Sequence, residues 1–348
     1  MKKSLLSMAA FAALATPAAF AQSSVTVYGK IDLGLVLDGG NPAGKSVRVS
    51  SGVSGGSRLG FKGVEDLGGG YKAGFQLETG YCADSAAGAP NFCTGSNNFM
   101  GRVARGDLIG SFGTLSAGRQ YSLGYSALVA LDPFGTGFAA QTDNTDGKGN
   151  YVVDPSAIRL NNSVAYTTPS LAGLTGSAEI SLGEQTGGWR KGTELGAAVN
   201  YASGPAFGSL TLYHLDNANG SGTARQTLQA GGTYDFGVVK LHALAQKVTG
   251  EPTGAARVDV LSLMGGVTVP LAGGNVLASF INRDDRTVAN QDAKQWGLGY
   301  LYPLSKLTSV YTAFAHIDNT HGGALHTGNA TETGVGDQSF NLGVVKNF

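Results

Sequence analysis

Residues 57–80 decide the fold, and they read SRLGFKGVEDLGGGYKAGFQLETG. Leu59 and Phe61 alternate with polar residues or glycine as far as residues 65–70, where two acids and three glycines mark a turn. After the turn, apolar residues again occupy every second position as far as Leu77. A period of two is typical of a strand with one apolar and one polar face. The stretch therefore predicts an antiparallel β-hairpin.

The same alternation continues on both sides of this hairpin. It begins at Val25 and returns in the final stretch, QSFNLGVVKNF, which ends on Phe348. Further short turns are expected in residues 110–114, 169–174, 203–208, 235–238, 270–275 and 303–307. Together with the first turn they define seven hairpins, and the first and last strands bring the expected total to sixteen.

Longer polar stretches, rich in Gly, Asn, Asp and Ser, separate the hairpins. They cover residues 38–56, 82–97, 120–157, 184–192, 216–223, 249–255, 284–291 and 319–336. Connections that are short on one side of a sheet and long on the other are typical of a transmembrane β-barrel. No segment after residue 21 predicts a helix as a second class of element. We therefore expect an all-β fold in which residues 22–348 form one sixteen-stranded antiparallel barrel.

The composition agrees with a barrel in a membrane. Of the 348 residues, 55 are glycine, only 14% are charged, and the formal net charge is +0. This low charge, with 9% aromatic residues, excludes a disordered chain, and no polybasic face is present for nucleic acid. In a soluble β-sandwich the polar strand faces would carry charge toward water, whereas glycine on these faces suits a lumen.

The N-terminus predicts export. Residues 1–21 contain Lys2 and Lys3, then an apolar stretch, and end on a small-x-small site at Ala19 and Ala21. This order is typical of a secretory signal peptide that is cleaved, here after Ala21. The alternative, a transmembrane anchor, is weaker because the apolar stretch is well short of the ~20 residues that a spanning helix needs.

The two cysteines of the sequence, Cys82 and Cys93, stand close together in a turn-rich segment. Export and short separation favour a disulfide bond that closes this loop. The alternative is a pair of free thiols. The spacing fits neither a redox motif nor a zinc site, and we expect no metal and no cofactor.

Four stretches resemble the trimeric, sixteen-stranded general-diffusion porins of Gram-negative outer membranes, in their β-proteobacterial branch. They are SSVTVYGKID at residues 23–32, the hairpin of residues 57–80, GTLSAGRQ at residues 113–120 and the C-terminal NLGVVKNF. The resemblance covers residues 22–348. It implies a homotrimer in the cell outer membrane, in contact with lipid and lipopolysaccharide, through which ions and small hydrophilic solutes diffuse passively. It also implies that the third loop, residues 120–157, folds into the lumen and narrows it.

In such porins, basic residues face acidic residues where the lumen is narrowest. By resemblance, Arg58, Arg102 and Arg159 match the basic side of this constriction, and Glu78 and Asp132 match the acidic side.

Strand phase gives an independent expectation for these side chains, because successive residues of a strand point to opposite faces. The residues that alternate with apolar neighbours, and so point into the lumen, are Arg58, Lys62, Glu78 and Arg159. Arg102 is out of phase with Val103 in a less regular strand. Arg119 matches the GRQ motif of the family, but it shares the phase of its apolar neighbours, which argues against a place in the lumen. The alternative role for each of these residues is an ordinary ion pair of the barrel wall.

The charges leave selectivity open. Arg58, Lys62, Arg102 and Arg159 favour anions. Carboxylates of the third loop argue the other way, namely Asp132, Asp143, Asp146 and Asp154. We expect a weak preference for anions or no strong preference.

Catalysis is not indicated. Residues 52–56 satisfy Gly-x-Ser-x-Gly, the motif of a hydrolase nucleophile, but they lie in a serine–glycine loop rather than between a strand and a helix. An enzyme on a barrel would need a catalytic cluster at one rim, and a receptor barrel would need a plug or a filled lumen. The sequence favours a passive channel over both.

Overall fold

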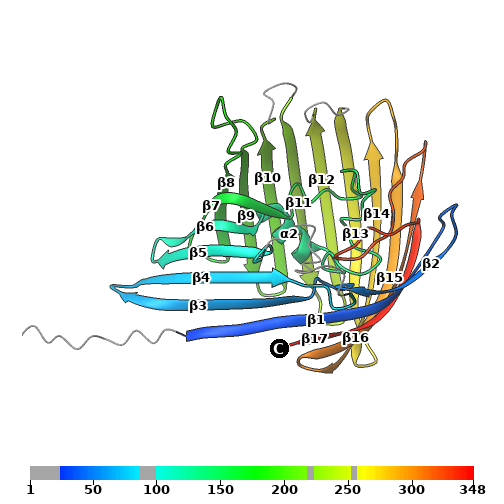
Figure 1. Ribbon diagram of the computed structural model, residues 1–348, viewed down its shortest axis with the longest axis horizontal. Coiled ribbons are helices and arrows are strands. Elements are labelled where there is room, and N and C mark those ends of the chain that lie inside the picture. The colour runs from blue at the N-terminus through cyan, green and yellow to red at the C-terminus, as the bar shows by residue number, and fades with distance from the viewer. Residues whose placement is uncertain (1–23, 86–98, 218–222, 252–256) are drawn as a thin grey trace, which may run out of the picture.

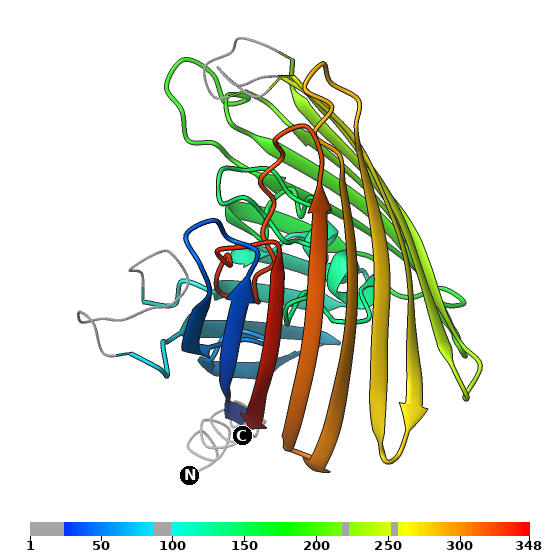
Figure 2. The same cartoon turned by 90° about the vertical axis from the view of Figure 1, so that its right-hand side faces the viewer.

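The computed structural model describes residues 24–85, 99–217, 223–251 and 257–348. They form one antiparallel β-barrel; in Figure 1, β3–β6 run across the view and β10–β14 stand upright behind them, and Figure 2 shows the same barrel from the side. Its elements are β1 Ser24–Gly39, β2 Ser46–Ser51, β3 Arg58–Gly68, β4 Tyr71–Gly80, β5 Val103–Gly110, β6 Gly113–Tyr121, α2 Leu123–Leu131, β7 Arg159–Thr167, β8 Leu174–Ser181, β9 Glu194–Ser203, β10 Ala206–Leu215, β11 Arg225–Asp235, β12 Lys240–Gly250, β13 Val258–Leu271, β14 Gly274–Asp285, β15 Ala293–Ser305, β16 Thr308–Asn319 and β17 Gln338–Asn347.

The first and last strands close the barrel. β1 pairs with β17 from Lys30↔Asn347 to Gly39↔Gln338. On its other side, β1 pairs with β3 over its first half and with β2 over its second half. The described segments β2 and β3 therefore occupy one place in the wall, and the seventeen strand segments make sixteen barrel positions. The sixteen-stranded barrel predicted from the sequence is confirmed.

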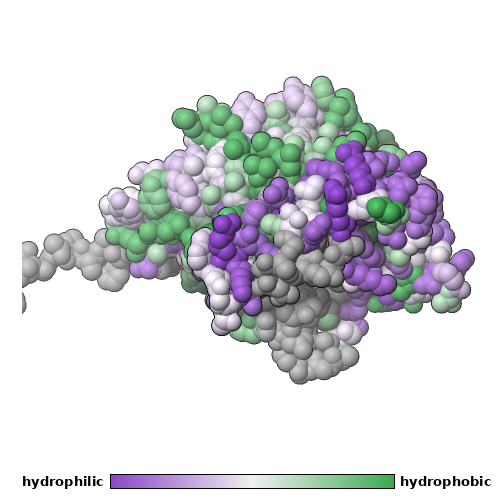
Figure 3. All heavy atoms as spheres, turned by 90° about the horizontal axis from the view of Figure 1, so that it is seen from above, coloured by the Kyte–Doolittle hydropathy of each residue, from purple (hydrophilic) through white to green (hydrophobic). Residues whose placement is uncertain are grey.

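The outer face of the wall is apolar, and aromatic residues ring its turn end. Leu212, on β10, and Leu298, on β15, are each more than half exposed on this face. At the turns, Tyr71 lies 6.3 Å from Phe112 between ring centroids, and Phe348 at the end of the chain is also exposed. An apolar band with an aromatic girdle is the outer surface that a transmembrane barrel presents to lipid. In the view from above, hydrophilic side chains gather mainly on the right of the molecule, and hydrophobic ones lie along its upper edge and left (Figure 3).

Two elements depart from the expectation. The third loop, residues 122–158 in the structure, contains the helix α2, whereas the sequence predicted no helix. Ser122 is its N-cap and accepts a hydrogen bond from the Tyr125 backbone N–H at 3.0 Å, a local signal for a helix start. β2 lies inside the stretch predicted as the first long loop. Among the described residues, no helix is long and apolar enough to cross a membrane.

Candidate functional site

Three of the described connections fold into the barrel. They are residues 52–57 between β2 and β3, the third loop, and the eighth loop, residues 320–337 between β16 and β17. The carbonyl of Val53 accepts hydrogen bonds from the backbone N–H groups of Phe138, at 2.7 Å, and Ala330, at 3.3 Å. The sequence predicted the inward fold of the third loop alone. The three segments instead meet one another and fill part of the lumen together.

Apolar side chains fix the third loop against the inner face of β12–β14. Leu128 and Leu131 of α2 are fully buried in a cluster with Leu244, Met264 and Ile281 of the wall. Burying a leucine side chain contributes about 2 kcal/mol. α2 contacts β9–β12 and lies within the curve of the sheet (Figure 1).

Hydrogen bonds to the wall hold the start of α2. The Leu123 N–H donates to Glu179 Oε1 at 3.0 Å, and the Gly124 N–H donates to the Tyr213 hydroxyl at 3.0 Å. The Tyr213 hydroxyl in turn donates to Glu179. A carboxylate at a helix N-terminus satisfies free N–H groups and favours the helix dipole. The position of α2 is thus fixed by packing along its side and by polar contacts at its start.

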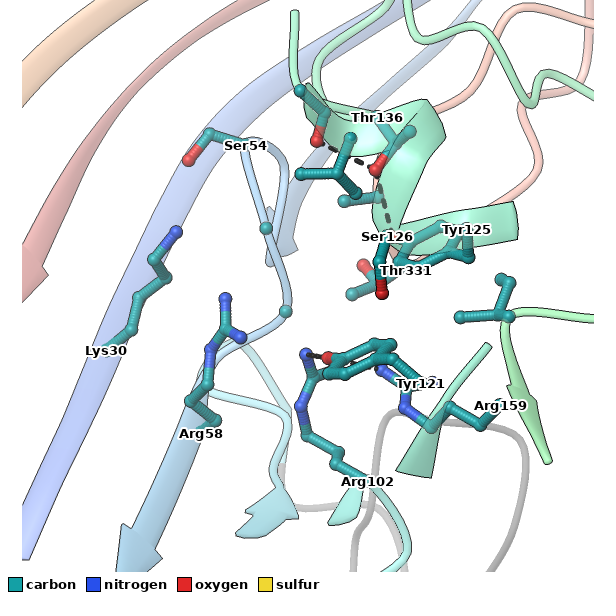
Figure 4. A pocket seen from close by; sticks show the side chains of 16 residues that line it. Lys30, Ser54, Arg58, Arg102, Tyr121, Tyr125, Ser126, Thr136, Arg159 and Thr331 are labelled. Carbon is teal, nitrogen blue, oxygen red and sulfur yellow. Dashed lines mark hydrogen bonds between the residues drawn. The ribbon is translucent and has the colours of Figure 1, made fainter. Parts of the chain in front are cut away.

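The space that the three inward segments leave open is a cavity of about 690 Å³ beside β1 and β3–β7. We call it the cationic cavity. It is lined by Lys30, Ser54, Gly55, Gly56, Arg58, Arg102, Tyr121, Tyr125, Ser126, Val129, Gly135, Thr136, Ile158, Arg159, Ala330 and Thr331. Among these residues four are basic and none is acidic, and their side chains converge on the space below α2 (Figure 4).

Glu78 and Tyr121 arrange the arginines. Arg102 Nε donates to Glu78 Oε1 at 2.7 Å, and Arg58 Nη1 lies 3.8 Å from the same oxygen. Both Arg102 and Arg159 donate to the Tyr121 hydroxyl, at 2.6 and 2.9 Å (Figure 4). The Arg159 guanidinium also lies 4.5 Å from the Tyr121 ring centroid, a cation–π contact. Glu78 is almost fully buried, so it balances part of the positive charge without facing the cavity.

The predicted basic cluster is therefore brought together: Arg58, Arg102 and Arg159 line one cavity, and Glu78 supports it from the wall. Lys62 is exposed and lies over the Tyr28 ring, at 5.3 Å from its centroid, outside the cavity lining. Tyr28 in turn donates to Glu78 at 3.0 Å, so Lys62 connects to the cluster through the wall.

Asp132 departs from the expectation that it faces the basic cluster. Its carboxylate is buried inside the third loop and accepts hydrogen bonds from the backbone N–H groups of Phe134, Thr136 and Thr142 at 2.9–3.1 Å. Burial raises the pKa of Asp132 to about 6, against these hydrogen bonds, which lower it. Burial, with the neighbouring Asp132 charge, raises the pKa of Asp143 to about 7. The Asp132 carboxylate therefore braces the loop from within.

Arg119 also lies outside the cavity lining. Its Nε donates to the Gly101 carbonyl at 2.6 Å, beside a β-bulge between β6 and β7 at Gly118. This placement agrees with its strand phase. Cys82 is disulfide-bonded, while Cys93, the other cysteine of the sequence, lies outside the described residues.

Several lining residues were not predicted. Lys30 stands on the polar face of β1, and its phase was the available signal. Ser54, Gly55 and Thr331 reach the cavity through loop folds that carry no local sequence signal. Ser54 belongs to the Gly-x-Ser-x-Gly stretch, and no helix follows it. The described residues contain no group of three or more His, Cys, Asp or Glu side chains that could hold a metal ion.

Known proteins resemble this chain over nearly its whole length. The family model described as Gram-negative porin matches residues 7–322. Outer membrane porin protein 32 of Delftia acidovorans is 34% identical over 93% of this chain and 92% of its own length. An outer membrane porin protein of Bordetella pertussis is 29% identical over 97% of this chain and 99% of its own length. The solved anion-selective porin from Comamonas acidovorans is 29% identical, with a TM-score of 0.80 over 94% of this chain and 100% of that one.

Proposed function

Because the chain belongs to the Gram-negative porin family, we propose that the cationic cavity is the constriction of its channel. The protein is an outer-membrane porin, a barrel for passive diffusion of small solutes, and it is not an enzyme. The observation that carries the proposal is the convergence of Arg58, Arg102 and Arg159 on one cavity that the inward segments leave open beside the wall.

Electrostatics would act strongly at this place. A narrow water-filled hole in a slab of low dielectric focuses the field of fixed charges onto whatever passes. Arginine suits this task because it stays charged at any working pH. Tyr121 holds two of the guanidinium groups in place, so their charges would act on a passing ion without first rearranging.

We further propose that this constriction favours anions. Three of the four third-loop carboxylates that could oppose such a preference are buried or paired: Asp132 and Asp143 are buried, and Asp154 forms an ion pair with Arg225. Lys30 adds a positive charge that the sequence alone had not assigned to the site. The similar porin from Comamonas acidovorans is described as anion-selective, which agrees with this preference.

The test is the triple variant Arg58→Ser, Arg102→Ser and Arg159→Ser in planar bilayers under a KCl gradient. Removing three cations from the passage should move the reversal potential toward cation preference. Arg190→Ser is the matched control, because Arg190 is an exposed arginine, 3.2 Å from Asp216. An unchanged reversal potential in the triple variant would remove these residues from the selectivity of the channel.

We propose that the assembled form is a homotrimer in outer-membrane lipid and lipopolysaccharide. Membership of the porin family supports this assembly. The mass of the purified protein in detergent, measured by light scattering, tests it. A monomer in mild detergent would contradict it, and current steps that close in threes would support it independently.

Two proposals concern maturation. Residues 1–21 are a signal peptide, so the mature chain begins at Gln22 and residues 22–348 make up the porin domain. Cys82 pairs with Cys93, because the sequence contains no third cysteine. The intact mass of the protein extracted from membranes, before and after reduction and alkylation, checks both.

A further inference from the structure

The segment that connects β2 and β3 folds into the lumen. Residues 52–57, which we call the bend, read GVSGGS and stand opposite Ile31 and Asp32 of β1, where the ladders of β2 and β3 stop. Gly52 begins the bend with a φ of +75°, a left-handed conformation that favours glycine. A Cβ there would also lie 2.8 Å from the Gly56 backbone. The bend is therefore a specific backbone shape.

Asp32 holds this shape from the wall. Its Oδ2 accepts the backbone N–H groups of Ser54, at 2.6 Å, and Gly55, at 2.9 Å, while its backbone carbonyl accepts the Gly52 N–H at 2.8 Å. Oδ1 accepts the Tyr311 hydroxyl at 2.6 Å. Asp32 is fully buried, so all of these contacts lie away from bulk water. Charge-assisted hydrogen bonds to a buried carboxylate are stronger than neutral ones.

The bend also carries the other two inward segments. Val53 accepts from the third and eighth loops, as described above, and the Thr331 hydroxyl donates to the Ser51 carbonyl at 2.6 Å, just before the bend. Gly137 of the third loop packs directly on the Ser54 backbone, where a Cβ would collide with it. A shift of the bend would therefore be felt by both loops.

On its open side, the bend presents bare backbone to the arginines. A Cβ on Gly55 would lie 3.0 Å from Lys30 Nζ and 3.5 Å from Arg58 Nη2. A Cβ on Gly56 would lie 2.7 Å from Arg102 Nη1. Ser54, Gly55 and Gly56 all line the cationic cavity, and Figure 4 shows Ser54 across from Lys30. The glycines thus leave room beside three of the four basic groups.

Resting on the proposed function of the cationic cavity, we propose that the bend is a fixed wall of the constriction. Gly55 is the specificity-determining position in it, and Asp32 is the positioning residue. Because Gly55 has no side chain, nothing at this position blocks or pairs with Lys30 and Arg58, and an anion can approach both charges. Because Asp32 holds the Gly55 N–H in place, the passage beside Gly55 keeps the same width as ions pass.

Gly55→Asp tests the first part, with Gly55→Asn as the neutral variant of nearly equal volume. The neighbours of the new side chain are the ends of two flexible cations, so the barrel should fold, and conductance steps report insertion. A carboxylate between Lys30 and Arg58 should move the reversal potential toward cations and lower the chloride current about twofold. The asparagine variant should keep the sign of the wild type. Equal reversal potentials for the two variants would overturn the proposal.

Gly56→Ala is the second variant, and it adds a methyl group against Arg102 without adding charge. It should lower conductance, whereas Gly265→Ala, whose Cβ would meet open space, should not. Equal conductance of both variants and the wild type would also count against the bend as a wall of the passage. If Arg58→Ser shifts the reversal potential and the Gly55 variants do not differ, only the role of the bend fails. If Arg58→Ser has no effect either, the proposed constriction itself fails.

The role of Asp32 is tested by the same pair of Gly55 variants in two backgrounds. Asp32→Asn loses the oxygen that accepts two N–H groups of the bend, whereas Tyr311→Phe loses only the hydroxyl on the other oxygen. The difference in reversal potential between aspartate and asparagine at position 55 should shrink in the first background and persist in the second. A residue that only stabilised the barrel would leave this difference unchanged in both. Equal differences in the two backgrounds would overturn the assignment.

Discussion

Two inner walls of this barrel differ in what they touch. The covered wall, the inner face of β11–β17, packs against the third loop through Leu244, Leu277 and Ile281. The charged wall, the inner face of β1 and β3–β7, carries Arg58 and Arg159 and borders the open cavity. The third loop thus covers part of one wall, whereas the other wall borders open space. On the proposed function, the covered wall would decide where the passage lies, and the charged wall would decide what passes.

The largest effect is expected when a charge is placed between the covered wall and the third loop. Leu128→Asp would bury a carboxylate in an apolar cluster at a cost of about 3 kcal/mol or more. The third loop should leave the wall, so that single-channel current rises and becomes noisy. Ala130→Asp, on the exposed side of α2, is the control and should leave the current quiet. Quiet, unchanged current in both variants would mean that this packing does not hold the loop.

A smaller effect is expected at the charged wall from Glu78→Gln. The variant removes the carboxylate that pairs with Arg102 at 2.7 Å. This loss should lower the free energy of unfolding of the barrel by ~2 kcal/mol. One negative charge fewer beside the passage should also strengthen the preference for anions. Thermal unfolding in detergent and the reversal potential measure the two effects. A lower melting temperature with an unchanged reversal potential would confine Glu78 to stability.

The contact at the start of α2 involves β8 and β10, which lie between the two walls, and its loss should give a smaller change. Tyr213→Phe removes a hydroxyl that accepts a hydrogen bond from the Gly124 N–H and donates one to Glu179. Its loss should lower the stability of the docked helix by about 1 kcal/mol. We expect more current noise and no shift of the reversal potential, because no charge changes. The lipid-facing variant Tyr201→Phe is the control. A shift of the reversal potential would show that this contact also shapes the charged wall.

The smallest effect is expected from pH. Between pH 8 and pH 5, Asp143 and then Asp132 take up protons, since their pKa values are about 7 and about 6. Both values lie above the ordinary 3.8, so the folded loop binds more protons than the unfolded chain, and its packing becomes more stable as pH falls. The lumen also loses negative charge, so the preference for anions should rise slightly toward pH 5.

Asp143→Asn should remove the part of this pH dependence that lies around pH 7 and leave the part around pH 6, which belongs to Asp132. Asp146→Asn is the matched control, because hydrogen bonds from Asn150 and the Lys148 N–H outweigh burial and keep the pKa of Asp146 below its ordinary value. It therefore stays charged throughout this range. A pH response that is equal in the wild type and in Asp143→Asn would contradict the assignment.

The strands and turns could be predicted because they rest on local alternation. The two strands of the hairpin in residues 57–80 stand where the pattern placed them, although β3 runs to Gly68, so the turn is shorter than the predicted residues 65–70. Arg58 and Arg159 could be placed in the lumen by phase alone, because a strand leaves two directions for a side chain. Phase also placed Arg119 outside the cavity, where the structure has it.

The loops could not be predicted in the same way. Asp132 was placed by resemblance, but an aspartate before proline in a turn readily accepts from backbone N–H groups that follow it, and Asp132 does so. The bend depends on Asp32 and Tyr311, which are far from it in sequence. One signal was available for the covered wall: β16 carries apolar residues on both faces, with Ala315 and Ile317 turned inward and Phe314 turned outward. A strand of that kind indicates that something inside the barrel covers it.

The sign of the reversal potential of the wild-type protein across a KCl gradient tests the central claim most directly. If the charged wall governs passage, chloride should cross more readily than potassium, and the preference should weaken as salt screens the arginines. A reversal potential of the sign set by potassium would contradict the claim, because the passage would then favour ions of the same charge as its own wall.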